Sequence, residues 1–232
     1  MEQQKLIRHI GFLIDGNRRW AKANGKAERA GYDAGADNVY AIAKACIERR
    51  VPYVTFWGLS TENFKNRTPA ELEYIFNAIK KTALRIEAMK SFRAGMRVIG
   101  NIKGLPDAAQ EFVATHLKPF TQSERLDTVV VAGLNYGGRD EIARAVKRMI
   151  RDGVEESAAD EERISSYLDT AGMPDPDLII RTGGKKRLSG FMPWQTVYSE
   201  LYFMDKLWPD FTADDLDAAI TWFSETERNF GK

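Results

Sequence analysis

Short apolar runs alternate with amphipathic segments along almost the whole chain. Five runs have the length and the β-branched or aromatic content of buried strands: residues 9–14, 51–58, 96–100, 127–134 and 177–181. A sixth run, residues 198–203, has the same character, although the pattern does not fix its order relative to its neighbours. The chain therefore contains about six candidate strands.

Four segments between these runs carry apolar residues at helical spacing. Their apolar faces are Val39, Ile42, Ala43, Cys46 and Ile47; Leu72, Ile75, Phe76, Ile79, Ala83 and Ile86; Ile142, Ala145, Val146, Met149 and Ile150; and Leu216, Ala219, Ile220 and Phe223. Thr68 and Glu71 predict a capping box at the start of the second helix, and Thr212 predicts the cap of the last. Gly153 has the position of a residue that ends the third. Strands that alternate with helices predict an α/β fold with a mainly parallel sheet covered on both faces.

Composition narrows the possible functions. The chain has 232 residues, with 34 Lys and Arg against 33 Asp and Glu, a net charge of +1. No linker or repeat divides it, so we expect a single domain over residues 1–232. The near-zero charge argues against a nucleic-acid partner. One cysteine, Cys46, and two distant histidines, His9 and His116, exclude a disulfide framework and a zinc cluster. A polar N-terminus without a signal peptide predicts a cytoplasmic protein.

The first predicted strand ends in a segment that could bind a diphosphate. Asp15-Gly16-Asn17-Arg18-Arg19-Trp20 follows it directly, and ligands of parallel sheets bind beyond the carboxyl ends of strands. A carboxylate beside two arginines suits a Mg²⁺–diphosphate group, because the metal takes oxygen ligands and the arginines neutralise the remaining charge. The alternative is a turn in which Asp15 caps a helix; the local sequence does not decide.

Polar segments follow three other strands. Residues 59–67 (LSTENFKNR) contain ordinary turn and cap residues, with Arg67 nearby as a possible anion ligand. Residues 135–140 (NYGGRD) match neither dinucleotide-binding nor P-loop spacing and favour a strand-to-helix turn. Residues 181–189 (RTGGKKRLS) gather four cations around paired glycines, which favours an anion site over a solvated surface. Farther on, Glu200 is either a structural charge or a metal ligand, and spacing does not choose between these.

Four segments together resemble successive signatures of the cis-prenyltransferase family: residues 9–20 (HIGFLIDGNRRW), 59–64 (LSTENF), 135–142 (NYGGRDEI) and 177–211 (DLIIRTGGKKRLSGFMPWQTVYSELYFMDKLWPDF). They occur in order along nearly the whole chain. The resemblance implies a Mg²⁺-dependent enzyme that extends an allylic diphosphate, usually farnesyl diphosphate, with isopentenyl diphosphate, each new double bond being cis. It also implies about six parallel strands, a hydrophobic tunnel for the growing chain, and a homodimer.

The resemblance assigns roles to particular residues. Asp15 would bind Mg²⁺ and help the allylic diphosphate to leave, and Glu200 would be a second metal-linked carboxylate. Asn63 would position the water or diphosphate oxygen that takes the proton, since a neutral amide is a poor base. Arg181 would hold isopentenyl diphosphate together with Arg187 and Ser189. The further substrate-binding residues are Gly16, Asn17, Arg18, Arg19, Trp20, Ser60, Thr61, Glu62, Phe64, Arg67 and Leu188.

The chain departs from the family pattern near the diphosphate site. The family often has Arg at the position of Glu28, His at that of Tyr32 and Glu at that of Lys185. Tyr32 can still donate a hydrogen bond to a phosphate, whereas Glu28 would repel one, and the adjacent Arg29 could serve in its place. Glu28 and Lys185 together indicate a charge exchange across one site, which predicts energetic coupling between them.

Two other functions remain compatible with these residues. One is a non-catalytic partner subunit, although the motif residues are all present together. The other is a relative that makes short or head-to-middle products with the same residues. By resemblance Gly58 lies near the entrance of the tunnel, where a small residue favours a long polyprenyl product. Such a product is insoluble in water, which favours peripheral attachment to the inner face of the membrane.

Overall fold

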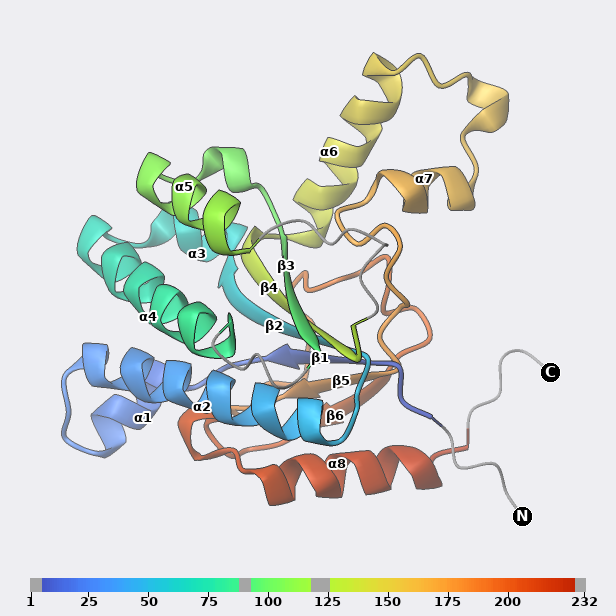
Figure 1. Cartoon of the computed structure of the whole chain (residues 1–232). Coiled ribbons are helices and arrows are strands. Elements are labelled where there is room, and N and C mark those ends of the chain that lie inside the picture. Colours follow the sequence, from blue (N-terminus) through green and yellow to red (C-terminus); the bar gives the residue numbers. More distant parts are fainter. Residues whose placement is uncertain (1–5, 88–92, 118–125, 228–232) are drawn as a thin grey trace.

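A six-stranded parallel sheet forms the centre of the protein (Figure 1). The computed structural model describes residues 6–87, 93–117 and 126–227 of the chain. The strands are β1 (His9–Leu13), β2 (Tyr53–Ser60), β3 (Ala94–Ile99), β4 (Thr128–Tyr136), β5 (Leu178–Arg181) and β6 (Glu200–Phe203). Their order across the sheet is β3-β4-β2-β1-β5-β6, and each neighbouring pair is parallel. The expected α/β fold with about six parallel strands is confirmed.

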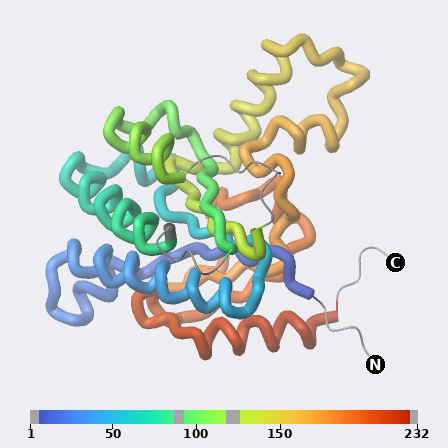
Figure 2. The backbone as a smooth tube through the Cα atoms, viewed as in Figure 1, coloured from blue at the N-terminus to red at the C-terminus, as the bar shows by residue number. Residues whose placement is uncertain are grey.

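Helices surround the sheet, and two of them, α6 and α7, project away from the body (Figure 2). The helices are α1 (Asn17–Ala23), α2 (Glu28–Glu48), α3 (Thr61–Asn66), α4 (Pro69–Glu87), α5 (Asp107–His116), α6 (Gly138–Arg151), α7 (Glu161–Tyr167) and α8 (Ala213–Glu225). Short 3₁₀-helices are η1 (Ile102–Gly104), η2 (Glu156–Ala158) and η3 (Trp208–Asp210).

The two faces of the sheet are covered differently. On one face, Phe12 stacks on Phe56 with ring centroids 5.0 Å apart, and both rings contact Trp208 of η3 beneath α2 and α8. On the other face, Leu13 packs against Phe191 in the segment after β5. Alternate residues of β1 therefore serve two cores, as expected for a strand covered on both sides.

Local capping fixes where the helices begin and end. Thr68 and Glu71 exchange hydrogen bonds before α4, and Thr212 and Asp215 form a capping box before α8. Gly153 follows α6 with φ of 69°, a conformation that glycine adopts without strain. These three predicted boundaries are confirmed.

Two expectations about helix faces need correction. Helix α2 begins at Glu28, well before the first large apolar residue of the pattern, because its first turns present glycines instead. On α6, Val146 is 42% exposed and Ile150 is 73% exposed, although the periodicity placed both on the buried face. Because α6 projects from the body, only part of its apolar face is covered.

Candidate active site

The main cavity has a volume of about 1230 Å³ and runs along one face of the sheet. Polar residues gather at the carboxyl ends of β1, β2 and β5, while the lining from α4 is apolar except for Thr82 and the lining from β3 and β4 is apolar throughout. The apolar lining includes Ile75, Ile79, Ile86, Met96, Leu117 and Val130. The volume exceeds the roughly 300–1,000 Å³ typical of small-molecule sites. One end of the cavity therefore suits charge and the rest suits a long hydrocarbon chain.

Asp15 lies at the polar end between two arginines. Gly16 turns the chain with φ of 120°, so that α1 begins at once. One carboxylate oxygen accepts a hydrogen bond from Arg19 at 3.3 Å and the other accepts one from Arg181 at 3.1 Å. The hydroxyl of Thr182 also donates to the backbone carbonyl of Asp15 at 2.8 Å. Asp15 therefore joins the two segments in which the sequence predicts anion binding.

Two glycines of α2 allow α1 to approach closely. A Cβ at Gly31 would lie 2.2 Å from the carbonyl oxygen of Asn17, and one at Gly35 would lie 2.5 Å from its Oδ1. Asn17 thus rests directly on the helix backbone. Its Oδ1 is buried without a hydrogen-bond partner among the described residues. Asn17 lines the cavity, but this oxygen faces the backbone of α2, so the amide N–H groups are the part of the side chain that could donate to a ligand.

Helix α3 begins at the cavity directly after β2. Ser60 accepts a hydrogen bond from the backbone N–H of Asn63 at 3.0 Å and so caps the helix. Thr61 donates to the carbonyl of Asn135 at 3.2 Å. Ser60, Glu62 and Asn63 line the cavity. Ser60 therefore caps α3, as the local sequence indicates, and it also lines the cavity with Glu62 and Asn63, as the resemblance implies.

The segment after β5 closes around Arg181, whose side chain is only 7% exposed. Arg181 donates to Ser189 Oγ at 2.9 Å and to the carbonyl of Arg187, while its Nε is buried without a partner among the described residues. Gly183 lies so close to Arg19 that a Cβ there would be 2.4 Å from the guanidinium. A buried guanidinium with a spare donor provides a fixed site for an anion.

Two residues that depart from the family pattern, Glu28 and Tyr32, each contact an arginine at the cavity. Glu28 forms an ion pair with Arg18 at 3.1 Å, and both side chains are about half exposed. Arg67 donates to the hydroxyl of Tyr32 and pairs with Glu71 at 2.8 Å. Burial raises the pKa of Tyr32, so it stays a neutral phenol. Glu28 thus reduces the charge that Arg18 offers to a ligand.

Arg29 and Lys185 lie outside the lining of the main cavity. Arg29 lies over the ring of Tyr74 at 5.5 Å and is 3.7 Å from Asp33. Within the described part of the chain, Lys185 forms no ion pair with Glu28, which contacts Arg18 instead. Glu28 and Lys185 therefore make no direct contact that could couple them, and their energetic coupling stays a prediction.

Glu200 lies at the opposite end of the strands from Asp15. It begins β6 and is in register with Leu178, whereas Arg181, beside Asp15, is in register with Phe203. Three residues separate these levels, or ~10 Å along the strand. A metal ion held jointly by Asp15 and Glu200 of one chain does not fit this geometry.

Five other expected substrate-binding residues do not line the main cavity. Trp20 donates its indole N–H to Asp210 at 2.7 Å, which holds α1 against η3. The other four support neighbouring segments: Thr61, Phe64, Arg187 and Leu188.

Sequence reasoning missed two cations and most of the apolar lining. Lys22 lies one helical turn after Arg18 on α1, and Lys26 follows the helix; both line the cavity. The spacing of Arg18 and Lys22 was a usable signal, since residues four apart share a helix face. The apolar lining offered no such signal, because it forms only where α2, α4, β3 and β4 meet.

The polar end fits a divalent cation that arrives with a substrate. Among the described residues no group of three or more His, Cys, Asp or Glu could hold a metal ion. The carboxylates that line the cavity are Asp15, Glu28 and Glu62; the side chain of Asp15 is 36% exposed. Mg²⁺ is commonly held by one or two carboxylates together with substrate phosphates and waters.

No described helix is long and apolar enough to span a membrane.

Comparisons with known proteins agree on one family. A family model described as "Putative undecaprenyl diphosphate synthase" matches residues 13–231. An isoprenyl transferase of Treponema denticola is 41% identical over 97% of each chain. A tritrans,polycis-undecaprenyl-diphosphate synthase (geranylgeranyl-diphosphate specific) of Thermoplasma acidophilum is 38% identical over 97% of this chain and 89% of its own.

Two solved structures share the fold. Lavandulyl diphosphate synthase from Lavandula x intermedia, in complex with dimethylallyl diphosphate, has a TM-score of 0.90 at 28% identity and covers 98% of this chain and 99% of its own. A probable undecaprenyl diphosphate synthase from Campylobacter jejuni has a TM-score of 0.76 at 30% identity, with both chains covered completely.

Proposed function

Because the chain belongs to the undecaprenyl diphosphate synthase family of cis-prenyltransferases, we propose that it joins isopentenyl diphosphate to an allylic diphosphate and repeats this step. The observation that carries the proposal is the main cavity, in which a cationic end opens directly into a long apolar interior. Such a cavity binds the two diphosphates at one end and the growing hydrocarbon at the other. Its volume of about 1230 Å³ favours a long polyprenyl product.

The allylic diphosphate is placed at the start of α1. Arg18 and Arg19 supply positive charge there, and the amide N–H groups of Asn17 can donate to a phosphate oxygen. Asp15 and the diphosphate would hold Mg²⁺, which neutralises the charge that develops on the leaving group. Arg19 and Arg181 keep the carboxylate of Asp15 in place for this role.

Isopentenyl diphosphate is placed at Arg181 and Ser189. Arg181 is buried and rigidly held, so it fixes the second diphosphate beside the first. The allylic carbon–oxygen bond breaks, diphosphate leaves with the electron pair, and the double bond of isopentenyl diphosphate forms the new carbon–carbon bond. Loss of a proton then restores a double bond. Asn63 positions the oxygen that accepts this proton, and much of the rate enhancement comes from alignment of the two substrates.

A second candidate function is a short or head-to-middle condensation. The observation that favours it is the likeness to lavandulyl diphosphate synthase, whose TM-score of 0.90 exceeds that of the undecaprenyl synthase structure. The cavity volume and the identities of about 40% to isoprenyl transferases favour chain elongation. The partner-subunit function is opposed by the complete polar end of the cavity.

Assembly and location follow from exposed surface and product chemistry. Exposed apolar side chains on α6 and before β6, at Val146, Ile150, Val197 and Tyr198, support a homodimer. Sedimentation of the purified chain at a mass near 53 kDa, twice the 26.3 kDa of one chain, tests this. A water-insoluble product supports peripheral attachment of a cytoplasmic enzyme to the inner face of the membrane.

The test is a product analysis with the purified chain alone. It receives Mg²⁺, labelled isopentenyl diphosphate and, in separate reactions, dimethylallyl, farnesyl or geranylgeranyl diphosphate. We expect farnesyl diphosphate to be the best acceptor and the products to be long polyprenyl diphosphates. A single condensation product from dimethylallyl diphosphate establishes the second candidate instead. The absence of any product from all three acceptors identifies a partner subunit.

A further inference from the structure

A second cavity lies between η1 and α6 and shares no lining residue with the main cavity. Its volume is about 390 Å³, within the range of roughly 300–1,000 Å³ seen for small-molecule sites. Its charged lining residues are Lys103, Arg144, Lys147, Arg148, Arg151 and Asp169. Cations therefore dominate a hollow of ligand size in a chain whose net charge is only +1.

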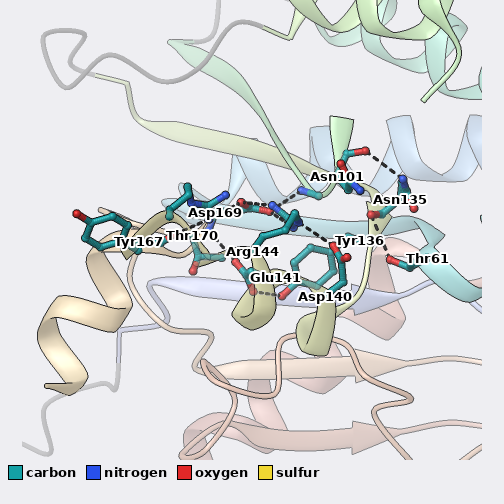
Figure 3. Close-up of polar contacts among 12 residues, drawn as sticks. Thr61, Asn101, Asn135, Tyr136, Asp140, Glu141, Arg144, Tyr167, Asp169 and Thr170 are labelled. Atoms are coloured by element: carbon teal, nitrogen blue, oxygen red, sulfur yellow. Dashed lines mark hydrogen bonds and ion pairs between the residues drawn. The ribbon is translucent and has the colours of Figure 1, made fainter. Parts of the chain in front are cut away.

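The floor of this cavity is a fixed ion-pair network. Arg144 donates two hydrogen bonds to Asp169, at 2.8 and 2.7 Å, as Figure 3 shows. Asp169 also accepts a hydrogen bond from the backbone N–H of Gly100 at 3.0 Å and lies 3.4 Å from Arg148. Asp140 pairs with Arg144 from the other side at 2.7 Å. The two arginines of the floor are thus held in place by neighbouring carboxylates.

Three further cations at the edge of this cavity, here called the rim, lie outside the ion-pair network of Arg144 and Asp169. Lys103, Lys147 and Arg151 are exposed. Neither lysine pairs with a carboxylate in the described part of the chain, and Arg151 lies 3.8 Å from its neighbour Asp152. Five cations line the cavity, and the carboxylates beside them are four: Asp140, Glu141, Asp152 and Asp169. An anion that enters between the rim and the floor meets a net positive charge.

We propose that this second cavity is a binding site for a phosphate group. Lys103 of η1 and Lys147 of α6 both line it, so each can offer charge-assisted hydrogen bonds to a phosphate bound there. The phosphate group is the shared chemistry of inorganic phosphate and of an anionic lipid headgroup, and a volume of 390 Å³ admits either. The inference does not rest on the proposed transferase activity.

The second cavity and the main cavity lie on two sides of the end of β4. Asn101, in the wall of the second cavity, exchanges hydrogen bonds of 3.0 and 3.1 Å with Asn135. The carbonyl of Asn135 also accepts from Thr61 at the start of α3, and Leu134 lines the main cavity (Figure 3). A phosphate in the second cavity would therefore bind outside the main cavity.

The test measures binding of labelled inorganic phosphate by equilibrium dialysis at low ionic strength. The full chain is compared with Lys147→Glu and Lys103→Glu, and with Arg163→Glu, which makes the same charge change on exposed α7. We expect each lysine variant to lose one class of site or to weaken it about tenfold or more, because the substitution replaces a charge-assisted hydrogen bond to phosphate with a like charge. Arg163→Glu should bind as the unaltered chain does.

Prenyl transfer by the same variants separates this inference from the proposed function. We expect Lys147→Glu to keep its elongation activity while it loses phosphate, since Lys147 does not line the main cavity. Circular dichroism checks the fold. Identical phosphate isotherms for Lys147→Glu, Lys103→Glu and the unaltered chain would overturn the proposal, whatever the activity.

Vesicles identify the source of the phosphate. The chain is sedimented with phosphatidylglycerol vesicles and, as a control, with phosphatidylcholine vesicles. Binding to phosphatidylglycerol that Lys147→Glu abolishes and Arg163→Glu retains supports a lipid headgroup as the ligand. Loss of phosphate binding in Lys147→Glu without any vesicle binding supports a free phosphate compound.

Discussion

The burial of His9 predicts a pH dependence of stability that one substitution removes. His9 has no exposed surface; its Nδ1 lies 2.7 Å from the carbonyl oxygen of Pro174, and its Nε2 lies 2.8 Å from Thr55 Oγ1. Because a carbonyl oxygen only accepts, Nδ1 carries the proton and Nε2 accepts from the hydroxyl of Thr55. Burial opposes the charged form and lowers the pKa of His9 from 6.5 to about 4.

The size of the effect follows from the two pKa values. The unfolded chain takes up the proton near pH 6.5, whereas the folded chain takes it up only near pH 4. The stabilisation by neutral His9 is therefore fully present above pH 6.5 and is lost as the pH falls towards 4. In this interval the free energy of unfolding should fall by up to ~1.4 kcal/mol per pH unit, about 3 kcal/mol in total.

Urea denaturation between pH 4 and 7.5 measures this effect. His9→Gln should lose this part of the pH dependence, whatever its stability at pH 7.5. His116→Gln is the matched control, because the chain has only these two histidines. It should keep the slope of the unaltered chain. Parallel curves for His9→Gln and the unaltered chain would refute the reasoning, since carboxyl groups contribute equally to both.

Three further predictions concern the main cavity. A Cβ at Gly58, which lines the main cavity, would make only ordinary contacts of 3.5 Å or more. Gly58→Leu should therefore extend a side chain into the cavity and shorten the products separated by chain length; unchanged lengths contradict the assigned path. Gly35→Ala should displace the Asn17 side chain, because the added Cβ would lie 2.5 Å from its Oδ1. We expect the KM for the allylic diphosphate to rise about tenfold or more; an unchanged KM would show that Asn17 does not bind this substrate. Glu28→Gln should release Arg18 and lower that KM by up to about fivefold, since an exposed ion pair is worth about 1 kcal/mol at most; a higher KM contradicts this.

The strands and capped helices could be predicted because their signals are local. Each apolar run became a strand, with ends shifted by at most two residues, as for β2. Thr68 and Thr212 cap their helices because a hydroxyl and a carboxylate three residues apart meet in any helix start. Asp15 and Arg181 were found from the rule that ligands bind at the ends of parallel strands.

Other features depend on contacts between distant segments. The distance of Glu200 from Asp15 follows from the register of β5 and β6, which the sequence does not specify. The early start of α2 reflects Gly31 and Gly35, whose purpose appears only when α1 lies against them. The second cavity joins η1 to α6, and no spacing along the chain connects Lys103 to Lys147.

We propose above all that Asp15, through Mg²⁺, and Arg181 hold the two diphosphates side by side at the mouth of the main cavity. The most direct test is single-turnover transfer of labelled isopentenyl diphosphate to farnesyl diphosphate with Mg²⁺. Asp15→Asn and Arg181→Gln are compared with the unaltered chain and with Arg163→Gln on α7. We predict that the first two lose about a hundredfold or more of the rate, as for removal of an electrostatic contact to a leaving group, while Arg163→Gln keeps it. A rate in Asp15→Asn equal to that of the unaltered chain would contradict the account.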